Sequence, residues 1–316
     1  MDAEGVADTA FVRQVTTEVL RSSELRPDTK IVIKPNLCYP VPKAGVTTSS
    51  GWLGSVIAAL RTYTEHITVV ESDGMRRAWT ADEVFANHGV FSLCRQYGIR
   101  AVNLTRESTR KASTSVSGKE VTLQLPDLLF DTDVFVTVPV PKIHSMTTVS
   151  IGLKNQWGCL PDALRFRYHH RFAEIVVAVN KIIRPRLSFV DGGYFLSRRG
   201  PLEGSPIPAG IAIAGECGPV EIASCALMNV DPASVPYLCL AQENGLLPPL
   251  SASAVKPEPG YKCVLERSLT DWLALAVFSS GPATRLLYDS FLAGPIHELY
   301  YSLSGGREYP PDWSSR

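Results

Sequence analysis

The sequence predicts an α/β protein with a largely parallel sheet, flanking helices and an apolar helical extension at the C-terminus. Over roughly the first 140 residues, short β-branched segments alternate with amphipathic ones, as in strands joined by helical crossovers. A second group of such segments follows residue 170. Beyond residue 270, apolar and aromatic residues gather in patches, and these predict the helical extension.

Residues 1–269 are therefore expected to form the α/β domain, either as one unit or as two lobes that meet near residues 140–170. Residues 270–316 are expected to form a helical tail. Such a tail packs either on the core of its own domain or on a dimer partner, so a homodimer is one possible assembly.

The periodicity of apolar residues places the elements of the first half. Pro35 ends the first strand because proline lacks a backbone donor, and Thr80 is a plausible helix cap. Ser117-Gly118-Lys119 supplies the turn of a hairpin. The expected elements are a helix at 11–22, a strand at 30–34, a helix at 51–63, a strand at 67–71, helices at 81–88 and 91–97, a strand at 100–104, a hairpin at 113–125 and a strand at 134–139.

The second half is expected to continue the same alternation. Its elements are a helix at 172–183, strands at 187–190 and 210–214, helices at 220–229 and 234–244, an irregular connection at 246–262 and the apolar tail at 270–304.

Composition excludes several classes of protein. The hydrophobic share of 45% and charged share of 20% are those of a globular protein, and the net charge of +0 gives no global attraction to nucleic acid or an anionic membrane. No secretory signal is visible, and no apolar stretch approaches the ~18 residues of a membrane span. The seven cysteines are scattered, without a metal or iron–sulfur pattern. We expect a reduced cytoplasmic setting, no nucleic-acid partner and no membrane span.

Polar side chains follow four of the predicted strands. They are Lys34 and Asn36, Glu71 and Ser72, Lys142 and His144, and Asp191. Ligands of open parallel sheets bind beyond the carboxyl ends of the strands, so these groups are candidates for one site. We expect Lys34, Asn36, Glu71, Ser72 and Asp191 to bind substrate, with Lys34 as a clamp for a carboxylate or phosphate. The alternative for each is an ordinary turn at the surface.

Lys142 and His144 are two residues apart in an extended segment, so their side chains can point the same way. A lysine beside a histidine disfavours the protonated ring, which leaves a neutral base near pH 7. We predict catalytic roles for both, with a solvated loop as the alternative.

Lys154 and Asn155 lie in an apolar, glycine-flanked segment. An apolar neighbourhood lowers the pKa of a lysine and suits it to proton transfer or imine formation, so Lys154 is a further catalytic candidate. Asn155 is expected to bind substrate. Alternatively, Lys154 extends along an apolar surface with its charge in water.

The segment 165–171 is the densest cationic stretch. His169 or His170 is a candidate base, and the sequence does not choose between them. A solvated helix start explains the same residues equally well. No cofactor is predicted. A divalent metal remains possible, with His144, His169 and Asp191 as its ligands, although no tight ligand spacing connects them. No GxGxxG or Walker lysine motif is present, so no nicotinamide or nucleoside-triphosphate site is expected.

An ordered set of eight motifs over roughly residues 30 to 245 resembles the family called domain of unknown function 362. The motifs are Ile33–Asn36, Thr47-Thr48, Glu71-Ser72, Pro141–His144, Leu153–Asn155 with Gly158, His169-His170, Val190–Gly192 and Gly200–Gly204. The resemblance implies a fold and a site, but no reaction, because the family has no generally assigned activity.

This chain departs from that family in two respects. Members often carry a ferredoxin-type iron–sulfur segment, for which this chain has no cysteine cluster, and they tend to have aspartates where this chain has Glu216 and Glu221. The chain is also distantly similar to the lactate racemase family, whose sites use lysines and histidines for acid–base chemistry on a hydroxy acid.

The function expected from these residues is enzymatic. A small anionic or enolisable carbonyl substrate would undergo isomerisation, elimination or a related tailoring step in a biosynthetic pathway, so an isomerase or lyase is favoured. Two alternatives stay open. One is a metal- or iron–sulfur-associated redox protein, and the other is a binding protein that docks through its C-terminal tail.

Overall fold

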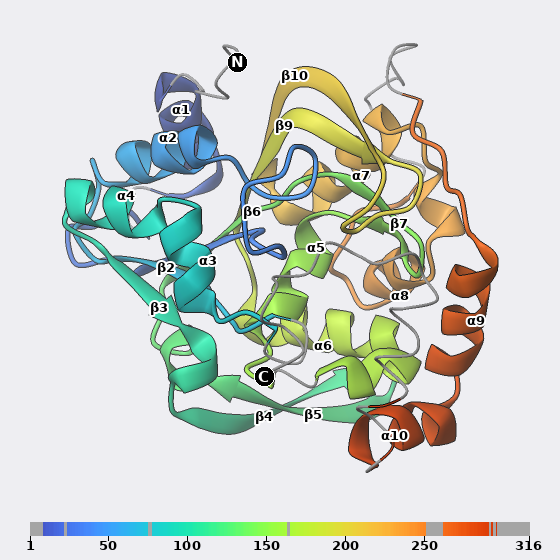
Figure 1. Ribbon diagram of the computed structural model, residues 1–316. Coiled ribbons are helices and arrows are strands. Elements are labelled where there is room, and N and C mark those ends of the chain that lie inside the picture. The colour runs from blue at the N-terminus through green and yellow to red at the C-terminus, as the bar shows by residue number, and fades with distance from the viewer. Residues whose placement is uncertain are drawn as a thin grey trace.

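Eight strands form the central sheet of the protein in the computed structural model (Figure 1). The structure describes residues 9–21, 24–74, 78–162, 165–250 and 262–290, together with Leu292 and Pro295. The spatial order is β3-β2-β1-β6-β9-β7-β8, and β10 pairs with β9. Only the β7–β8 and β9–β10 pairs of this sheet are antiparallel. The strands are β1 (Ile31–Pro35), β2 (Ile67–Glu71), β3 (Arg100–Asn103), β6 (Val134–Val138), β7 (Lys142–His144), β8 (Thr148–Ser150), β9 (Leu187–Ser197) and β10 (Ser205–Glu216).

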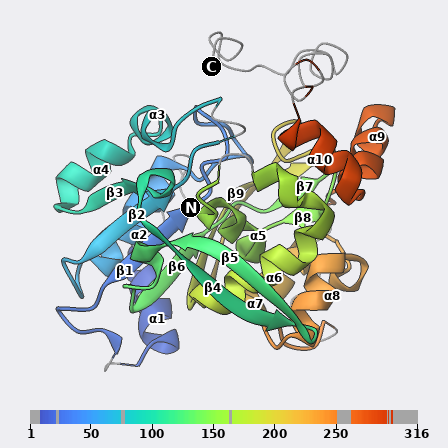
Figure 2. The same cartoon turned by 90° about the horizontal axis from the view of Figure 1, so that it is seen from below.

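Helices cover the sheet on both faces, which confirms the predicted α/β class (Figures 1 and 2). One face carries α1 (Thr9–Val19), α2 (Ser50–Leu60), α3 (Ala81–Asn87) and α4 (Val90–Tyr97). The other carries the hairpin β4 (Thr109–Val116) and β5 (Lys119–Pro126) with α6 (Phe172–Ile183), α7 (Cys217–Leu227) and α8 (Pro236–Glu243).

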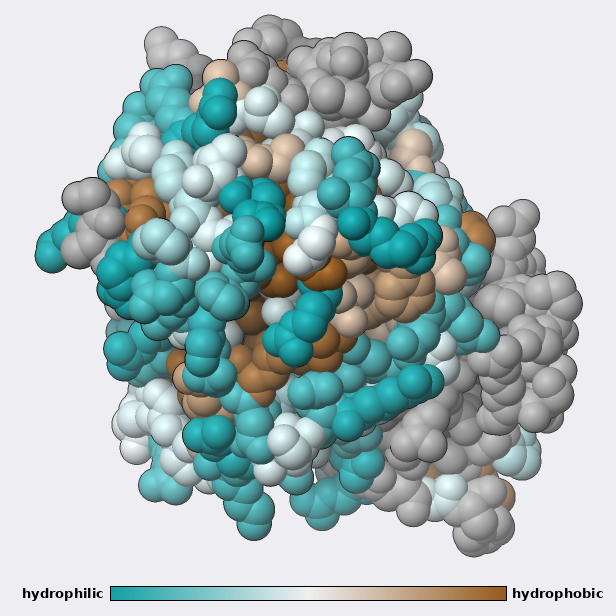
Figure 3. All heavy atoms as spheres, turned by 90° about the vertical axis from the view of Figure 1, so that its left-hand side faces the viewer, coloured by the Kyte–Doolittle hydropathy of each residue, from teal (hydrophilic) through white to brown (hydrophobic). Residues whose placement is uncertain are grey.

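Successive side chains of a strand point to opposite faces of the sheet, so each face has its own hydrophobic core. In β6, Val134 and Val136 pack in the core beneath α1–α4, whereas Phe135 packs in the core beneath α6–α8. On the side of α3 and α4, hydrophilic residues form most of the surface, with apolar residues visible between them (Figure 3).

Short elements connect the sheet to α6 and close one end of the molecule. After β8 come α5 (Gly152–Asn155) and two 3₁₀ segments, Gln156–Cys159 and Arg165–Arg171. The C-terminal helices α9 (Leu269–Phe278) and α10 (Gly281–Asp289) lie beside them, at the red end of the chain in Figure 1. Among the described helices, none is long and apolar enough to cross a bilayer.

One local prediction and one alternative were wrong. The strand expected at 187–190 continues to Ser197, so Asp191-Gly192-Gly193 lies within β9 and forms no loop. Gly192 permits this because a Cβ there would lie 2.6 Å from the Ile211 carbonyl oxygen of β10. Residues 142–144 form the buried strand β7, which agrees with the extended segment expected for Lys142 and His144, and the alternative of a solvated loop is wrong.

The apolar tail was predicted as helix, and α9 and α10 confirm this as far as Asp289. Trp272, Leu273 and Leu286 are exposed on these helices. The remaining tail residues singled out in the sequence, Phe291, Leu299, Tyr300 and Tyr301, lie outside the described residues, as does most of the connection at 246–262.

Candidate functional site

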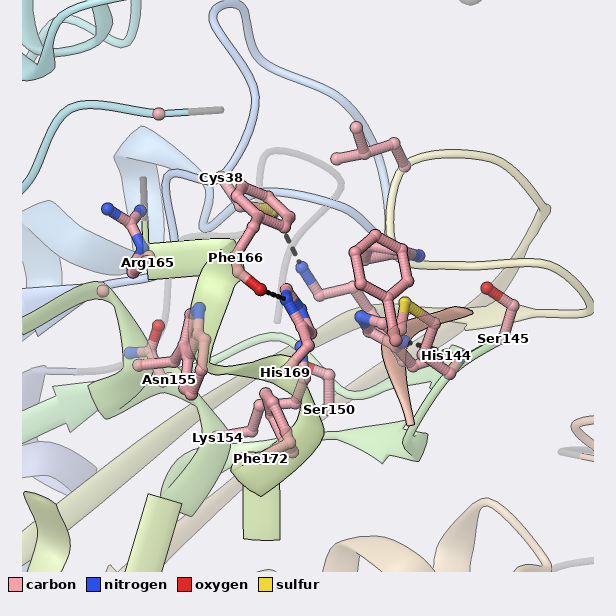
Figure 4. Close-up of a pocket in the computed structure, with 18 of the residues that line it drawn as sticks. Cys38, His144, Ser145, Ser150, Lys154, Asn155, Arg165, Phe166, His169 and Phe172 are labelled. Atoms are coloured by element: carbon pink, nitrogen blue, oxygen red, sulfur yellow. Dashed lines mark hydrogen bonds between the residues drawn. The ribbon is translucent and has the colours of Figure 1, made fainter. Parts of the chain in front are cut away.

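A cavity of about 430 Å³ lies beyond the carboxyl ends of β1 and β2, between the segment 142–172 and helix α9. Figure 4 shows its lining. Of the candidate residues, those that line it are Lys34, Asn36, Glu71, Ser72, Lys142, His144, Lys154, Asn155 and His169. Asp191 and His170 are not among the lining residues. The structure thus brings nine of the eleven candidates together.

Lys34 and Glu71 form a buried ion pair at the ends of β1 and β2. Lys34 Nζ lies 2.6 Å from Glu71 Oε2 and also donates to the Pro35 carbonyl oxygen at 2.7 Å. Ser72 N donates to the other oxygen of Glu71 at 3.0 Å. Gly158 covers the pair closely, since a Cβ there would lie 2.8 Å from Glu71 Oε1. The charge of Lys34 is therefore largely balanced within the protein.

Lys142 is fully buried on β7. Its Nζ donates to the Val46 carbonyl oxygen at 2.7 Å and to Cys38 Sγ at 3.2 Å. Burial lowers the pKa of Lys142, and the Cys38 sulfur opposes that lowering.

Lys154 extends from the short helix α5 toward the ring of Phe172, with Nζ 5.6 Å from the ring centroid (Figure 4). Among the described residues, Nζ has no hydrogen-bond acceptor or ion-pair partner. Burial lowers the pKa of Lys154 to about 7, and the positive charge of Lys142 acts in the same direction. A substantial fraction of the amine is therefore neutral at pH 7, as the apolar surroundings in the sequence predicted.

Glu221 is a buried carboxyl that accepts a hydrogen bond from the backbone of α5. Its Oε2 accepts from Leu153 N at 2.9 Å, and Oε1 accepts from the Tyr237 hydroxyl at 3.1 Å. Burial raises the pKa of Glu221 to about 7. This carboxyl positions the helix that carries Lys154 without lining the cavity itself.

His169 and His170, which the sequence did not separate, have different surroundings. His169 stacks on Phe166, with ring centroids 4.9 Å apart, and its Nδ1 lies 2.7 Å from the Phe166 carbonyl oxygen (Figure 4). Nδ1 is the donor in that bond, so the neutral ring keeps Nε2 as an acceptor. Burial lowers the pKa of His169 to about 4, so this ring is neutral at pH 7. His170 instead packs against Gly281 at the start of α10.

His144 has the opposite tautomer. Met146 N donates to His144 Nδ1 at 3.1 Å, so the proton of the neutral ring resides on Nε2. The cavity therefore contains one histidine with an acceptor at Nε2 and one with a donor there.

Arg165 lines the cavity and was not among the candidates. Its side chain is buried, and Nη1 donates to the Asp73 carbonyl oxygen at 3.0 Å. Nε and Nη2 have no acceptor among the described residues. The sequence signal was its place at the start of the cationic stretch 165–171, but only the fold shows that this residue turns inward.

Three buried polar side chains of the lining lack partners among the described residues. They are the Asn36 amide and the hydroxyls of Ser145 and Ser150, whose residues are 5%, 6% and 4% exposed. Asn155, in contrast, donates to the Lys34 carbonyl oxygen and to Thr137 Oγ1, both at 2.9 Å. Asn155 thus holds α5 on the strand ends, whereas Asn36 and Ser150 can bind a ligand.

The cavity has an excess of positive charge. Its cationic residues are Lys34, Lys142, Lys154 and Arg165, and its carboxylates are Glu71 and Asp271. Glu71 pairs with Lys34, and Asp271 pairs with Arg199 at 3.0 Å. A small anion is therefore the ligand that this lining favours.

The possible metal set of His144, His169 and Asp191 is not assembled at the cavity. The Asp191 carboxylate accepts from Ser49 N at 2.7 Å and Gly193 N at 3.2 Å, inside the sheet. Within the described ranges, no group of three or more His, Cys, Asp or Glu residues is arranged to hold a metal.

Comparison with known proteins gives a family match. The domain of unknown function DUF362 matches residues 31–226. A thylakoid-associated protein of Synechocystis sp. is 30% identical over 134 residues, which are 40% of this chain and 42% of that protein. The structure of the lactate racemase apoprotein from Thermoanaerobacterium thermosaccharolyticum is similar with a TM-score of 0.46 and 15% identity, over 70% of this chain and 54% of that one.

Proposed function

The chain belongs to the DUF362 family, and from its cavity we propose that it is an enzyme that moves a proton on a small anionic carbonyl compound. Lys154 carries this proposal. It is a lysine with a pKa of about 7 that faces a cavity and has no partner for its amine among the described residues. An amine with these properties takes a proton from carbon at neutral pH far better than an ordinary lysine.

The substrate's carboxylate binds to the unused donors of Arg165. A planar guanidinium matches a carboxylate in two parallel hydrogen bonds. Asn36 and Ser150 add neutral hydrogen bonds to the carbonyl or hydroxyl groups of the substrate. Lys142, fixed by Val46 and Cys38, supplies positive potential without moving.

In the reaction, the bond between hydrogen and the carbon next to the carbonyl breaks, and the proton passes to the Lys154 amine. The electron pair remains as an enolate, which the positive charges of Lys142 and Arg165 stabilise. Return of the proton to another position gives isomerisation, and loss of a neighbouring group gives elimination. His144 can donate from Nε2, and His169 can accept there.

Deuterium exchange tests this proposal directly. Small 2-oxo and 3-oxo carboxylates are incubated with the protein in deuterated water, and loss of the carbon-bound proton is followed by NMR. Lys154→Met should reduce exchange by ~10²-fold or more. In the unaltered protein, exchange should rise with pH through about 7, because only the neutral amine of Lys154 accepts a proton.

Lys111→Met is the matched control, since Lys111 is exposed on β4. It should exchange as the unaltered protein does. Equal exchange in Lys154→Met and Lys111→Met would contradict the assignment. Borohydride added with a 2-oxo acid distinguishes proton transfer from imine formation, because only an imine leaves a stable mass increase on Lys154.

A further inference from the structure

Cys38 differs from the other cysteines of the described residues. It follows β1, is half-buried and lines the cavity. Five others are buried: Cys94, Cys159, Cys217, Cys225 and Cys263. For Cys159, burial raises the pKa to about 12. Cys239 is half-buried like Cys38, but it lies outside the cavity and contacts the Ala233 carbonyl oxygen.

The Cys38 sulfur is one of two acceptors that the described residues offer to the Lys142 ammonium. The N–S distance is 3.2 Å, and the other acceptor is the Val46 carbonyl oxygen at 2.7 Å. The Cys38 sulfur lies 3.6 Å from that same oxygen. Lys142 is 0% exposed, so water cannot compensate its charge. The buried ammonium therefore lies directly against the Cys38 sulfur, and an adjacent cation favours the thiolate form that acts as a nucleophile.

The other charges around Cys38 act in the same direction or balance one another. Lys154 interacts electrostatically with both Cys38 and Lys142, and its protonated form adds positive charge. The Lys34–Glu71 pair is internally neutralised. His144 lines the same cavity and adds no negative charge in either protonation state.

A second observation marks this place as a binding site. The buried Asn36 amide and Ser150 hydroxyl line the cavity and have no partner among the described residues. Polar groups that are buried in this way cost free energy unless a ligand or water satisfies them.

We propose that Cys38 is a nucleophile that adds to a small α,β-unsaturated carboxylic acid or ketoacid bound in this cavity. This rests on the proposed function, since it uses the same anion site and the same proton carrier. A lone pair of the Cys38 thiolate forms a bond to the β-carbon. The carbon–carbon π pair moves to give the enolate, and the α-carbon then takes a proton from the Lys154 ammonium. The reverse sequence releases the unsaturated acid, and no oxidant or reductant is needed.

Alkylation of the full-length protein tests the nucleophile, with Cys239 as an internal reference. Iodoacetamide and iodoacetate are applied separately between about pH 6 and pH 10, and peptide mass spectrometry gives the rate at each cysteine. At pH 7, Cys38 should react about tenfold faster than Cys239, because a cation lies against its sulfur. The preference for iodoacetate over iodoacetamide should be larger at Cys38, because Lys142 Nζ lies 3.2 Å from its sulfur.

Lys142→Met keeps the volume of the buried side chain and removes its charge. In this variant the alkylation rate of Cys38 at pH 7 should fall toward that of Cys239. Acrylate should give a stable adduct in the unaltered protein and none in Cys38→Ser. An unaltered alkylation rate of Cys38 in Lys142→Met, or equal rates at Cys38 and Cys239 in the unaltered protein, would overturn the proposal. If Lys142→Met does not fold, the comparison between Cys38 and Cys239 in the unaltered protein decides.

The two proposals can fail separately. Alkylation by iodoacetamide needs no proton from Lys154, so an unreactive Cys38 leaves the deuterium-exchange result intact. Conversely, if no deuterium exchange is observed, an alkylation result that shows a reactive Cys38 still stands.

Discussion

Glu221 shows how one buried residue connects stability to the candidate site. In the unfolded chain its carboxyl ionises near the ordinary pKa of 4.5, whereas burial raises the pKa in the folded protein to about 7. Between these values the folded state holds a proton that the unfolded state has released. Stability should therefore fall as pH rises from about 4.5 through about 7, by an amount on the order of 3 kcal/mol.

Glu221→Gln removes this titration and retains an acceptor for Leu153 N. Its free energy of unfolding should be nearly flat over that pH window and should exceed that of the unaltered protein at pH 8. Urea unfolding at several pH values measures this. Glu216→Gln, on an exposed carboxylate at the end of β10, is the control and should keep the original slope. An unchanged slope in Glu221→Gln would refute the role of this carboxyl.

Individual residues also show what the sequence could not reveal. Lys154 was predicted from its apolar neighbours, and its pKa of about 7 follows from the same neighbours. Arg165 was not predicted, because its burial depends on the Asp73 carbonyl oxygen, which is distant in the sequence. His169 and His170 are adjacent in one 3₁₀ segment, and only packing against Phe166 and α10 separates them.

At the scale of elements, continuous apolar segments were predicted well. The segments that became β1, β2 and β6 are buried on both faces, so their composition alone indicates parallel strands. The polar groups that follow β1 and β2 accordingly meet at one edge of the sheet. The continuation of β9 past Gly192 was missed because glycine pairs usually indicate turns, whereas here the small residue permits close approach of β10.

The 3₁₀ segment Gln156–Cys159 provides a test of packing between elements. Gly158 lies against the Lys34–Glu71 pair, where an added Cβ would come within 2.8 Å of Glu71 Oε1 and 3.0 Å of Lys34 Cε. Gly158→Ala should displace the pair or lift the segment from β1 and β2, at a cost of about 1–3 kcal/mol in stability. Thermal and urea unfolding would measure the loss.

Gly54→Ala is the control for that substitution. Gly54 lies within α2, where the nearest atom to an added Cβ is the flexible end of Leu93 at 3.3 Å. Alanine also favours a helix over glycine, so stability should change little or increase. Equal losses in both variants would show that close packing on the ion pair is not responsible.

At the scale of the whole molecule, the net charge gives no indication of the cationic cavity. The net charge is +0, yet four cationic side chains line one cavity with two carboxylates, both of which are paired. Composition therefore predicted the absence of a global attraction to polyanions and could not predict a local preference for a small anion. The local field arises from the fold, which collects residues from β1, β7, α5 and the segment 165–171.

The C-terminal helices complete this cavity, and their removal is the corresponding test. Leu273, Val277 and Phe278 of α9 and Leu287 of α10 line it, and the Phe278 ring lies 5.0 Å from that of His169. A chain that ends at Ser268 should expose this apolar lining, bind a hydrophobic dye, and melt at a lower temperature. In the shortened chain the pKa of His169 should also rise, because water would reach the ring and reverse the effect of burial. An NMR titration of His169 would detect that shift. If the shortened chain kept its melting temperature and its affinity for small carboxylates, α9 and α10 would not be needed for the stability of the domain or for its cavity. Their exposed Trp272 and Leu286 would then be candidates for docking to a partner.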